Sequence, residues 1–536
     1  MNQTSYINFL KKAKFNPTKA KQYQKAYQKI KETDLFDEKF YLEQYHNVAK
    51  SNIDPLIHYL FYGGNEGKYP SLKFNGNQYQ NTYKEALNTN PLVHYILKGQ
   101  YENHETFPVN YNQQYETILK NNLLYLHNYI FTEEPLVSII ILNRNGYHHL
   151  KRLFKDFKKN TNYNNYEIII VDNASTDQSV EYLNSLDLPI RIIQNSQNES
   201  FSHGNNQAVK IAKGELILLL NNDIQPTYGW LNEMVGTITE NENTAAVGAK
   251  LIYPYYFDRV SINKSFTIQH TKVKFEEVIT NDYEYGPIHE DIEEKDIFNK
   301  KYNQKEQVLA VTAACILIKK SVYEELGGLD EEYFYGYEDV DFMLKIHEKN
   351  YNVMCAGGAL LFHHESSTRN DEGKFIEQNI KNIKTLTRKW EEYLFKNILL
   401  DKIKKLKFFT NYKLTIGILN TKPSNTNDKT IKNLAKEVNK NDYNIELITD
   451  EKTRITSKET DILIIFDSTF DISKLKMRKH TIKILYVEDK IPENIEDYNI
   501  ILTKNNENNM SDNVFLIENL NLDCILDTVT KFYNIQ

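Results

Sequence analysis

The sequence predicts an α/β protein in which a central α/β domain follows a small helical repeat region and precedes a second, smaller α/β domain. Three observations predict this architecture. Short, continuously apolar runs alternate with helical segments between residues 135 and 250, a pattern recurs at a fixed interval before them, and further apolar runs follow residue 412. Apolar strands separated by helices are typical of a parallel sheet that is covered on both faces. At 536 residues the chain also exceeds the size of one ordinary domain.

Composition excludes several classes of protein. The chain is 40% hydrophobic and 26% charged, which is typical of a globular protein with apolar cores. Its formal net charge is −7, so we expect no nucleic-acid partner. Three scattered cysteines argue against a disulfide framework and favour a reducing compartment. We recognise no signal peptide and no apolar run of the roughly 18 residues that a membrane span needs, so we expect a cytoplasmic protein.

Residues 1–35 predict a helical lead-in, and residues 36–108 predict two tandem helical repeats. The segment "NIDPLIHYLFYGG" is echoed by "NTNPLVHYILKGQ", and their proline, histidine and glycine positions are each 36 residues apart. A proline at the start of a helix and a glycine near its end mark helix boundaries, and such units bury their faces by stacking. His58 and His94 could form a ligand site, but packing is favoured because each lies in an apolar helix stripe.

The central domain is predicted over residues 134–410. Three of its strands end in Asn143, Asp172 and Asp223. Ligands of such sheets bind beyond the carboxyl ends of the strands, so we expect these three residues to converge on one crevice. In chain order the first four strands, with helices between them, are "PLVSIIILNRNG", "YEIIIVDNAST", "IRIIQN" and "ELILLLNND".

An aromatic, acidic insert without regular pattern extends from Lys250 to about Gln307, and apolar runs and a helix then resume. A Lys-rich helical stretch closes the domain. Its residues 396–409 are interpreted as a solvated charged helix, with contact to an anionic bilayer as the alternative. Residues 412–536 contain six further apolar runs and predict a Rossmann-like domain. Because no G-x-G-x-x-G loop is present there, we expect an accessory role for it.

Acidic residues mark the candidate site. Asp172 and Asp223 each follow a buried strand, where a carboxylate can cap a helix or face a ligand. The segment "YGYEDVDFMLKI" places Glu338, Asp339 and Asp341 in the first turn of a helix. The helix dipole favours acids there, but three acids beside two tyrosines and a glycine exceed what capping needs. A carboxylate in a partly aromatic pocket makes a good general base.

Two histidines complete the constellation. His363 and His364 close the apolar run "ALLF". A neutral imidazole beside Asp223 would give a mixed oxygen and nitrogen site for Mn²⁺ or Mg²⁺. These pieces fit a nucleoside-diphosphate substrate, whose departing diphosphate needs a divalent cation and whose attacking hydroxyl needs a base. His363 is preferred because it directly follows the strand, and His364 stays open.

Residues 135–405 resemble a family 2 glycosyltransferase with the GT-A fold. The subset resembled is rhamnosyltransferase-like, in which the usual Asp-x-Asp is written Asn-x-Asp, here the Asn221–Asp223 segment. Ser200 departs from relatives that often carry glycine before the phenylalanine. The resemblance rests on the order and spacing of "VSIIILNRN", "IIIVDNASTDQS", "NESFSHGNNQAVKIAKGELILLLNNDI", "GGLDEEYFYGYEDVDFMLKI" and "LLFHHESS". The segment "IQHTKVKF" also resembles a region near an acceptor site.

The resemblance implies an inverting transfer from a nucleoside-diphosphate sugar to a glycan or lipid-linked acceptor, with peripheral contact at the inner membrane face as a further expectation. Asp339 would act as the base, with Glu338 as the other candidate. Asp223 and His363 would hold the divalent metal. Asp172 would bind the nucleobase, and the remaining donor-site residues would be Asn173, Asn143, Asn206 and Asn222. The tandem repeats resemble segments attached to other polysaccharide glycosyltransferases.

Two other functions compete with transfer. A sugar-1-phosphate nucleotidyltransferase shares a similar sheet and metal, but it would need a Gly-rich basic loop that "LNRNGYHHLKR" matches poorly. A non-catalytic carbohydrate-binding protein on a degenerate transferase fold is the second alternative, and the intact set of acids weighs against it. A dinucleotide oxidoreductase is disfavoured because its fingerprint loop is missing. The donor sugar, its base, the linkage and the oligomeric state do not follow from the sequence.

Overall fold

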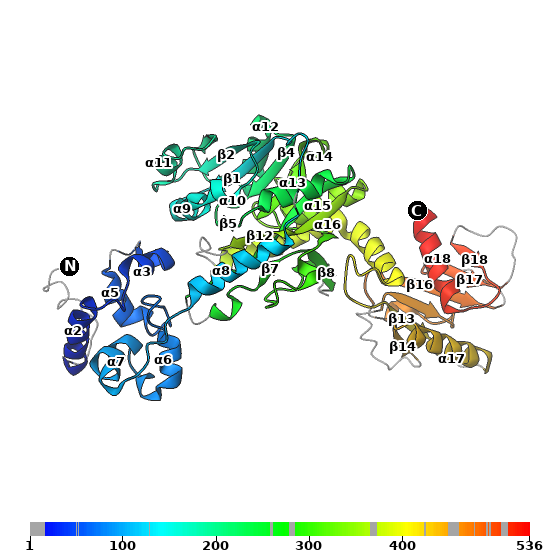
Figure 1. Cartoon of the computed structure of the whole chain (residues 1–536). Coiled ribbons are helices and arrows are strands. Elements are labelled where there is room, and N and C mark those ends of the chain that lie inside the picture. The colour runs from blue at the N-terminus through cyan, green and yellow to red at the C-terminus, as the bar shows by residue number, and fades with distance from the viewer. Residues whose placement is uncertain are drawn as a thin grey trace.

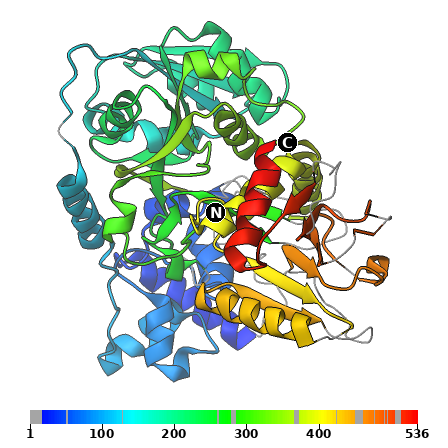
Figure 2. The same cartoon turned by 90° about the vertical axis from the view of Figure 1, so that its right-hand side faces the viewer.

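The computed structural model arranges the chain in three parts, which Figures 1 and 2 show from two sides. A helical region comes first, the large central domain follows, and a smaller α/β unit ends the chain. The structure describes residues 17–49, 51, 53–127, 129–257, 261–277, 285–364, 372–422, 425–448, 460–475, 477–488, 491–492, 495–504 and 513–535. Among these residues, we find no helix that combines the length and the apolar character needed to cross a bilayer.

The N-terminal region consists of short helices. In each repeat a proline begins the second helix, and Asp54 or Asn90 caps it by accepting backbone N–H groups. The lead-in forms α2 (Pro17–Lys31). The first repeat comprises α3 (Glu38–Gln44), α4 (His46–Ala49), α5 (Pro55–His58) and η1 (Tyr59–Gly63), and the second comprises α6 (Gly76–Thr82), η2 (Lys84–Ala86), α7 (Pro91–Leu97) and η3 (Gly99–Glu102).

Each repeat packs a buried tyrosine against a half-buried histidine. The Tyr41 hydroxyl lies 3.0 Å from His58 Nδ1, and the Tyr79 hydroxyl lies 2.8 Å from His94 Nδ1. The glycine that recurs in each repeat gives the tyrosine room, because a Cβ on Gly99 would come within 2.2 Å of the Tyr79 hydroxyl. These contacts agree with the packing interpretation of the repeated histidines.

One residue of the central domain joins the core of the repeats. Phe257 is buried among their aromatic side chains, and its carbonyl oxygen accepts a hydrogen bond of 2.5 Å from the Tyr45 hydroxyl. Phe257 follows β6 (Thr244–Ile252), a strand of the central sheet. The repeats are thereby attached to the loop that leaves this strand.

The central domain is built on a ten-stranded mixed sheet. Its main path runs β10-β12-β6-β11-β4-β1-β2-β3, and β5 and β7 pair with β12 and β6. The register pairs Asn143, at the end of β1, with Asp172 in β2. The remaining strands are β1 (Val137–Asn143), β2 (Tyr166–Asn173), β3 (Ile190–Asn195), β4 (Leu216–Leu220), β5 (Ile224–Pro226), β7 (Ile268–His270), β10 (Lys305–Gln307), β11 (Cys315–Lys319) and β12 (Asn352–His363).

The prediction of a parallel sheet is correct for β1 to β4, but other strands of the sheet run antiparallel to their neighbours. β11 runs antiparallel to both β4 and β6. Adjacent parallel strands need a crossover connection, usually a helix. The described residues between β6 and β11 form short strands and single 3₁₀ turns instead, so the chain re-enters the sheet in the opposite direction.

Helices cover both faces of the sheet, as the continuously apolar strands predict. Ile139 of β1 points into one core, whereas its neighbour Ile140 points into the other. The first core is completed by α9 (Tyr147–Lys155), α10 (Phe157–Asn160), α11 (Ser179–Asn184) and α13 (Trp230–Thr239), and the second by α12 (Phe201–Ile211), α14 (Lys320–Glu325) and α15 (Glu338–Glu348). Before the sheet, α8 (Tyr111–Asn122) and η4 (Leu123–Tyr125) lead in from the repeats.

The insert that showed no regular pattern contains a β-hairpin. Strands β8 (Val273–Glu277) and β9 (Tyr285–His289) pair antiparallel, apart from the main sheet. Two short turns, η5 (Ile262–Lys264) and η6 (Lys300–Tyr302), lie in the same insert. Strands this short carry too few residues for a periodic signal.

The C-terminal unit is a six-stranded parallel sheet in the order β14-β13-β15-β16-β17-β18. It packs against the long helix α16 (Glu372–Lys404), where Leu394 and Ile398 share one apolar core with Ile525 of α18. Figures 1 and 2 both show these two helices side by side. Its elements are β13 (Thr415–Leu419), α17 (Asn425–Lys440), β14 (Asn444–Ile448), β15 (Ile462–Ile465), η7 (Ile472–Lys474), β16 (Ile482–Val487), β17 (Ile500–Thr503), β18 (Val514–Leu516) and α18 (Leu522–Ile535).

The Lys-rich stretch is not a uniformly solvated helix. Lys402 is 1% exposed and lies 2.8 Å from Asp461 and 2.5 Å from Glu277 of β8. Arg478 is equally buried and pairs with the same two carboxylates. The solvated interpretation is therefore wrong at Lys402, because α16 presents this side to the C-terminal sheet.

Candidate active site

A cavity of about 430 Å³ opens beyond the carboxyl end of β4. It is lined by side chains from distant parts of the chain, among them Asp223, Glu338, Asp339 and His363. These are the two predicted metal ligands and the two predicted bases. The structure therefore brings the two pairs together, whereas only Asp223 of the three strand-end residues expected to share one crevice lines this cavity, and Asn143 and Asp172 do not.

Asp223 and His363 face each other in this cavity. Asp223 lies in the turn between β4 and β5, and His363 is the last residue of β12, whose pairing with β5 sets it opposite Ile224. The Nε2 atom of His363 is 3.3 Å from Oδ1 of Asp223. Burial opposes ionisation of Asp223, but the charge and proximity of the His363 ring hold the pKa of this carboxyl below its ordinary value.

Gln269 of β7 fixes the orientation of the His363 ring. Its side-chain oxygen lies 2.9 Å from Nδ1 of His363. An amide oxygen only accepts hydrogen bonds, so Nδ1 of His363 carries a proton that it donates to Gln269, and Nε2 is the nitrogen that faces Asp223. Such a partner on the second ring nitrogen is what metal-binding histidines commonly have.

His364 is oriented differently. Its backbone N–H donates to the carbonyl oxygen of Asp223 at 3.0 Å, and its Nε2 lies 3.3 Å from the side-chain oxygen of Gln225. Burial, followed by the nearby Arg152, holds its pKa well below the ordinary value. Its side chain is outside the cavity lining, so the geometry favours His363 as the ligand.

The pair Glu338 and Asp339 begins α15. Tyr337, in the left-handed region with φ of 70°, turns the chain into this helix. Asp339 accepts hydrogen bonds from the backbone N–H groups of Ala313 at 3.0 Å and Val340 at 2.8 Å. Glu338 is 4% exposed, and burial, with the charge of Asp339, raises its pKa to about 8.

The predicted donor residues Asp172, Asn143 and Asn222 form a connected network. Asp172 is 2% exposed, and its carboxylate accepts from Asn143 Nδ2 at 3.0 Å and from the Ser175 hydroxyl at 2.6 Å. Asn143 in turn accepts from Asn222 Nδ2 at 2.9 Å. The network therefore joins the end of β2 to the turn that carries Asp223, although its members lie outside the lining of the cavity.

The other two predicted donor residues are engaged by protein groups. Asn173 accepts from Asn195 at 2.9 Å. The side-chain oxygen of Asn206 accepts from Tyr323 and Leu329, and its NH₂ group donates to the Leu329 carbonyl and to Glu331. With its hydrogen-bonding capacity filled, Asn206 fixes the loop before α15 and lies outside the cavity.

Two histidines of the cavity had no assigned role in the sequence. His270 accepts from the Thr312 backbone N–H at Nε2, so its Nδ1 carries the proton and donates to Nδ1 of His289 at 2.7 Å. Burial, with His289 nearby, keeps the pKa of His270 well below its ordinary value. The segment "IQHTKVKF" gave a signal for His270, whereas His289 lies in the insert, where no pattern marked it.

The site has the donors that a divalent cation requires. Oδ1 of Asp223 is buried and receives no hydrogen bond from the residues that the structure describes. The imidazole nitrogen that faces it, Nε2 of His363, can become a metal ligand when it loses its proton, because Gln269 holds the proton on Nδ1. One carboxylate oxygen and one neutral nitrogen suit Mn²⁺ or Mg²⁺, whose remaining positions are filled by phosphate oxygens and water when a diphosphate is bound. The residues present therefore fit the predicted metal.

Comparison with known proteins finds similarity over the central domain. Residues 138–327 match the family model described as "Glycosyl transferase family 2". The O-antigen biosynthesis protein RfbC of Myxococcus xanthus is 29% identical over 44% of this chain and 18% of its own length. The low-salt glycan biosynthesis hexosyltransferase Agl10 of Haloferax volcanii is 24% identical over 40% of this chain and 63% of its own. The chain thus spans less than two thirds of either relative.

Solved structures are more distant. GalNAc-T7, crystallised with UDP, GalNAc and Mn²⁺, has 16% sequence identity and a TM-score of 0.35, and the match covers 44% of each chain. The family-model match over residues 138–327 runs from β1 through α14 and includes Asp172 and Asp223, whereas the pair that begins α15 follows it. Residues 138–327 of this chain form a glycosyl transferase family 2 domain.

Proposed function

We propose that the chain is an inverting glycosyltransferase that moves a sugar from a nucleoside diphosphate to a hydroxyl group of a glycan or lipid-linked saccharide. The observation that carries the proposal is one cavity that contains both the Asp223–His363 pair and the Glu338–Asp339 pair. The names of RfbC and Agl10 support a role in the synthesis of surface polysaccharide or glycoconjugates.

Asp223 and His363 would hold the divalent cation. When bound, such a cation neutralises charge on the departing diphosphate. The protein's own contribution is to hold a carboxylate oxygen and an imidazole nitrogen in a fixed arrangement. Gln269 maintains that arrangement through its contact with His363 Nδ1.

Asp339 is the better candidate for the base. With its pKa raised to about 8, Glu338 is protonated at neutral pH and cannot take a further proton. Because Glu338 is then neutral, no second negative charge lies beside Asp339. Asp339 would accept the proton of the attacking acceptor hydroxyl, while Glu338 acts as a buried hydrogen-bond donor.

Asp172 would receive the nucleobase or ribose, with Asn143 and Asn222 holding its carboxylate in place. A carboxylate at the end of a sheet strand can accept hydrogen bonds from such groups. Asn173, next to Asp172 in the sequence, remains a proposed donor-site residue. Asn206 is left out of the donor site, because protein groups fill the hydrogen-bonding capacity of its amide and it lies outside the cavity.

The test is a screen of nucleoside-diphosphate sugars with Mn²⁺, read as nucleoside diphosphate released by hydrolysis or transfer. We expect release from at least one donor, with loss of release in the Asp339→Asn variant. Pyrophosphate released from a nucleoside triphosphate and a sugar phosphate would favour a nucleotidyltransferase instead. Donor binding without release in the presence of acceptor glycans would favour a non-catalytic binding protein.

A further inference from the structure

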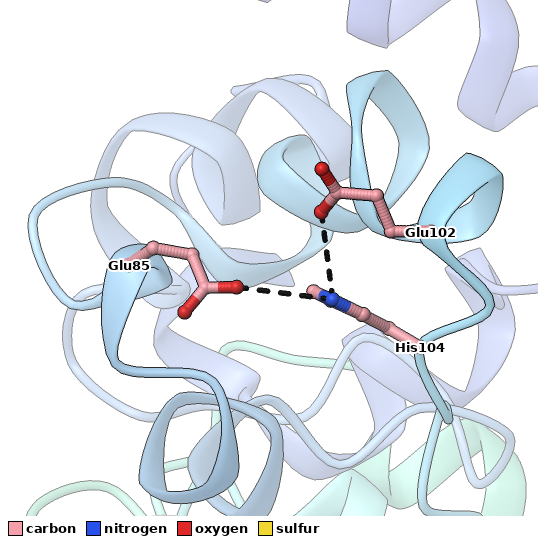
Figure 3. A group of neighbouring side chains, drawn as sticks. All are labelled: Glu85, Glu102 and His104. Carbon is pink, nitrogen blue, oxygen red and sulfur yellow. Dashed lines mark ion pairs between the residues drawn. The ribbon is translucent and has the colours of Figure 1, made fainter.

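Three side chains of the second repeat converge on one point, away from the cavity of the central domain. Nε2 of His104 lies 3.5 Å from a carboxylate oxygen of Glu102 and 3.8 Å from one of Glu85. The three ligand atoms all lie within 4.8 Å of one another. Figure 3 shows both carboxylates pointing at the edge of the His104 ring, one from η2 and the other from η3.

A hydrogen-bond chain indicates which nitrogen of His104 is protonated. The Tyr79 hydroxyl lies 3.0 Å from Nδ1 of His104 and 2.8 Å from Nδ1 of His94. One hydroxyl has a single proton to donate, so it donates to one ring and accepts from the other. Donation to His94 leaves the proton on Nδ1 of His104 and a lone pair on Nε2.

The separations support this tautomer. A protonated Nε2 would draw a carboxylate to within about 2.7–3.2 Å. Both carboxylates stand farther away than that. Ligands of a tetrahedral metal at about 2.0–2.2 Å lie roughly 3.3–3.6 Å from one another, which is close to the distances of 3.5 Å and 3.8 Å from His104 Nε2 to the two carboxylates. The ring itself is held by stacking on Tyr83, with 3.7 Å between centroids.

The first repeat places a cation at the equivalent position. Counting 36 residues back, Glu102 and His104 correspond to Glu66 and Lys68. The intervening residues, Gly67 and Asn103, both have left-handed backbones, with φ of 75° and 57°. The two loops therefore follow the same path.

The contacts of Lys68 repeat those of His104. Lys68 pairs with Glu66, and its ammonium group lies 5.4 Å from the ring centre of Tyr45, the counterpart of Tyr83. In the second repeat an uncharged imidazole replaces the lysine. In the first half of the repeat the offset is 38, as between Tyr45 and Tyr83, so the second carboxylate, Glu85, stands where the first repeat has Asn47. The first repeat thus carries its own cation, Lys68, whereas the second repeat presents three side chains that can bind a cation.

We propose that the second repeat binds a divalent cation, preferably Zn²⁺, through Glu85, Glu102 and His104. Carboxylate oxygen and imidazole nitrogen are common zinc ligands, and water would take the fourth position. Tyr79 would support the site through the second nitrogen of His104, as outer-shell partners do. Lys98 lies 3.5 Å from Glu102, but both side chains are about half exposed, so this pair competes weakly.

The bound ion would tie η2 to the chain that follows η3. It therefore has a structural task in the repeat, separate from the transfer reaction proposed above. The two metal sites must be distinguished in any test. We choose the Asp223→Ala background, which removes a ligand of the proposed transferase metal.

The experiment is equilibrium dialysis of the full chain against Zn²⁺ after treatment with a chelator. The Asp223→Ala chain should retain about one Zn²⁺. Adding His104→Lys, which installs the residue of the first repeat, should abolish this binding. Adding Glu85→Gln, an exposed and isosteric change, should weaken it on the order of tenfold or more. Adding Lys68→His, the matched change in the first repeat, should leave it unchanged because Asn47 supplies no third ligand.

Far-UV circular dichroism of each variant would establish that the chain is folded. The proposal is overturned if the Asp223→Ala chain binds no Zn²⁺, or if His104→Lys and Glu85→Gln both leave Zn²⁺ binding as it was. Because dialysis does not measure transfer, the two proposals can fail separately. A chain with Asp223 intact that transfers no sugar, while the Asp223→Ala chain binds Zn²⁺ through His104, would count against the proposed transferase function alone.

Discussion

Nε2 of His363 lies 3.3 Å from Oδ1 of Asp223, at the point where β12 and β4 reach the same edge of the central sheet. The two residues are far apart in the sequence. His363 ends the apolar strand β12, and Asp223 lies in the turn that follows the apolar strand β4. The pair is positioned by backbone pairing on one side and by Gln269 on the other. It is the natural centre of the proposed donor site, and the first predictions concern it.

Asp223→Ala should reduce sugar transfer on the order of 10²-fold or more, because one of the charge-stabilising groups of the site is lost. His363→Ala should have an effect in the same direction. The transfer rates of both variants can be measured as initial rates over a range of Mn²⁺ concentrations. Addition of a chelator to the wild-type chain should lower the rate in the same way. Near-normal rates in either folded variant would remove that residue from the metal site.

Gln269→Ala should raise the Mn²⁺ concentration required for half-maximal activity by about 10–100-fold, because His363 would no longer be held in one tautomer and orientation. The rate at saturating metal should fall less. Gln225→Ala is the matched control, since that amide contacts His364 instead. An equal shift in both variants would show that Gln269 has no special relation to the metal.

The acidic pair should respond asymmetrically to amide substitution. Asp339→Asn should nearly abolish turnover while the chain stays folded, since the proposed base is lost. Glu338→Gln should retain substantial turnover, because a glutamine reproduces the neutral donor that Glu338 is at neutral pH. Turnover numbers of the two variants at pH 7 settle the assignment, and the reverse order would make Glu338 the base.

Glu338 should also make the stability of the chain depend on pH. Its pKa is raised to about 8 in the folded state from an ordinary value of 4.5. Between these values the folded state holds a proton that the unfolded state has lost, so stability falls as pH rises from about 4.5 to about 8. The melting temperature of Glu338→Gln relative to wild type should therefore increase between pH 5 and pH 8. A constant difference across that range would show that Glu338 ionises normally.

The stability of the junction between the central domain and the C-terminal unit should depend on Arg478. Removing it by Arg478→Ala leaves the buried carboxylates of Glu277 and Asp461 short of one cation, which should cost roughly 3–5 kcal/mol. Lys479→Ala is the matched control, because the Lys479 side chain is 67% exposed and its ion pair should contribute about 1 kcal/mol or less. Urea unfolding of both variants tests this. Similar midpoints would mean that the buried cluster does not stabilise the junction.

Much of the fold could be predicted because local patterns encode it. The continuously apolar strands β1, β2 and β4 predicted a sheet with two covered faces, and Asn143 and Asp172 are indeed partners in the register. The antiparallel entry of β11 could not be predicted, because strand direction depends on the connection, and the insert carries no periodic signal. The burial of Lys402 was missed for a similar reason, since its partners Glu277 and Asp461 are distant in the chain.

The site was predictable where its residues end strands or begin a helix. Asp223, Asp339 and His363 occupy such positions, and the structure places all three around one cavity. Asn206 shows the limit of that reasoning, because its position within a motif does not reveal that Tyr323 and Leu329 engage its amide. His289 shows the opposite limit, since only the folded hairpin brings it to His270.

The central claim is that one cavity gathers the metal pair, the base and a nucleoside-diphosphate sugar. The most direct measurement is a crystal structure with Mn²⁺ and the nucleoside diphosphate that best stabilises the chain, with the metal located by its anomalous scattering. We predict one Mn²⁺ bound by Asp223 and His363, with the diphosphate in the cavity that Asp339 lines and the base near Asp172. A diphosphate bound elsewhere, or a metal that contacts neither Asp223 nor His363, would contradict the account.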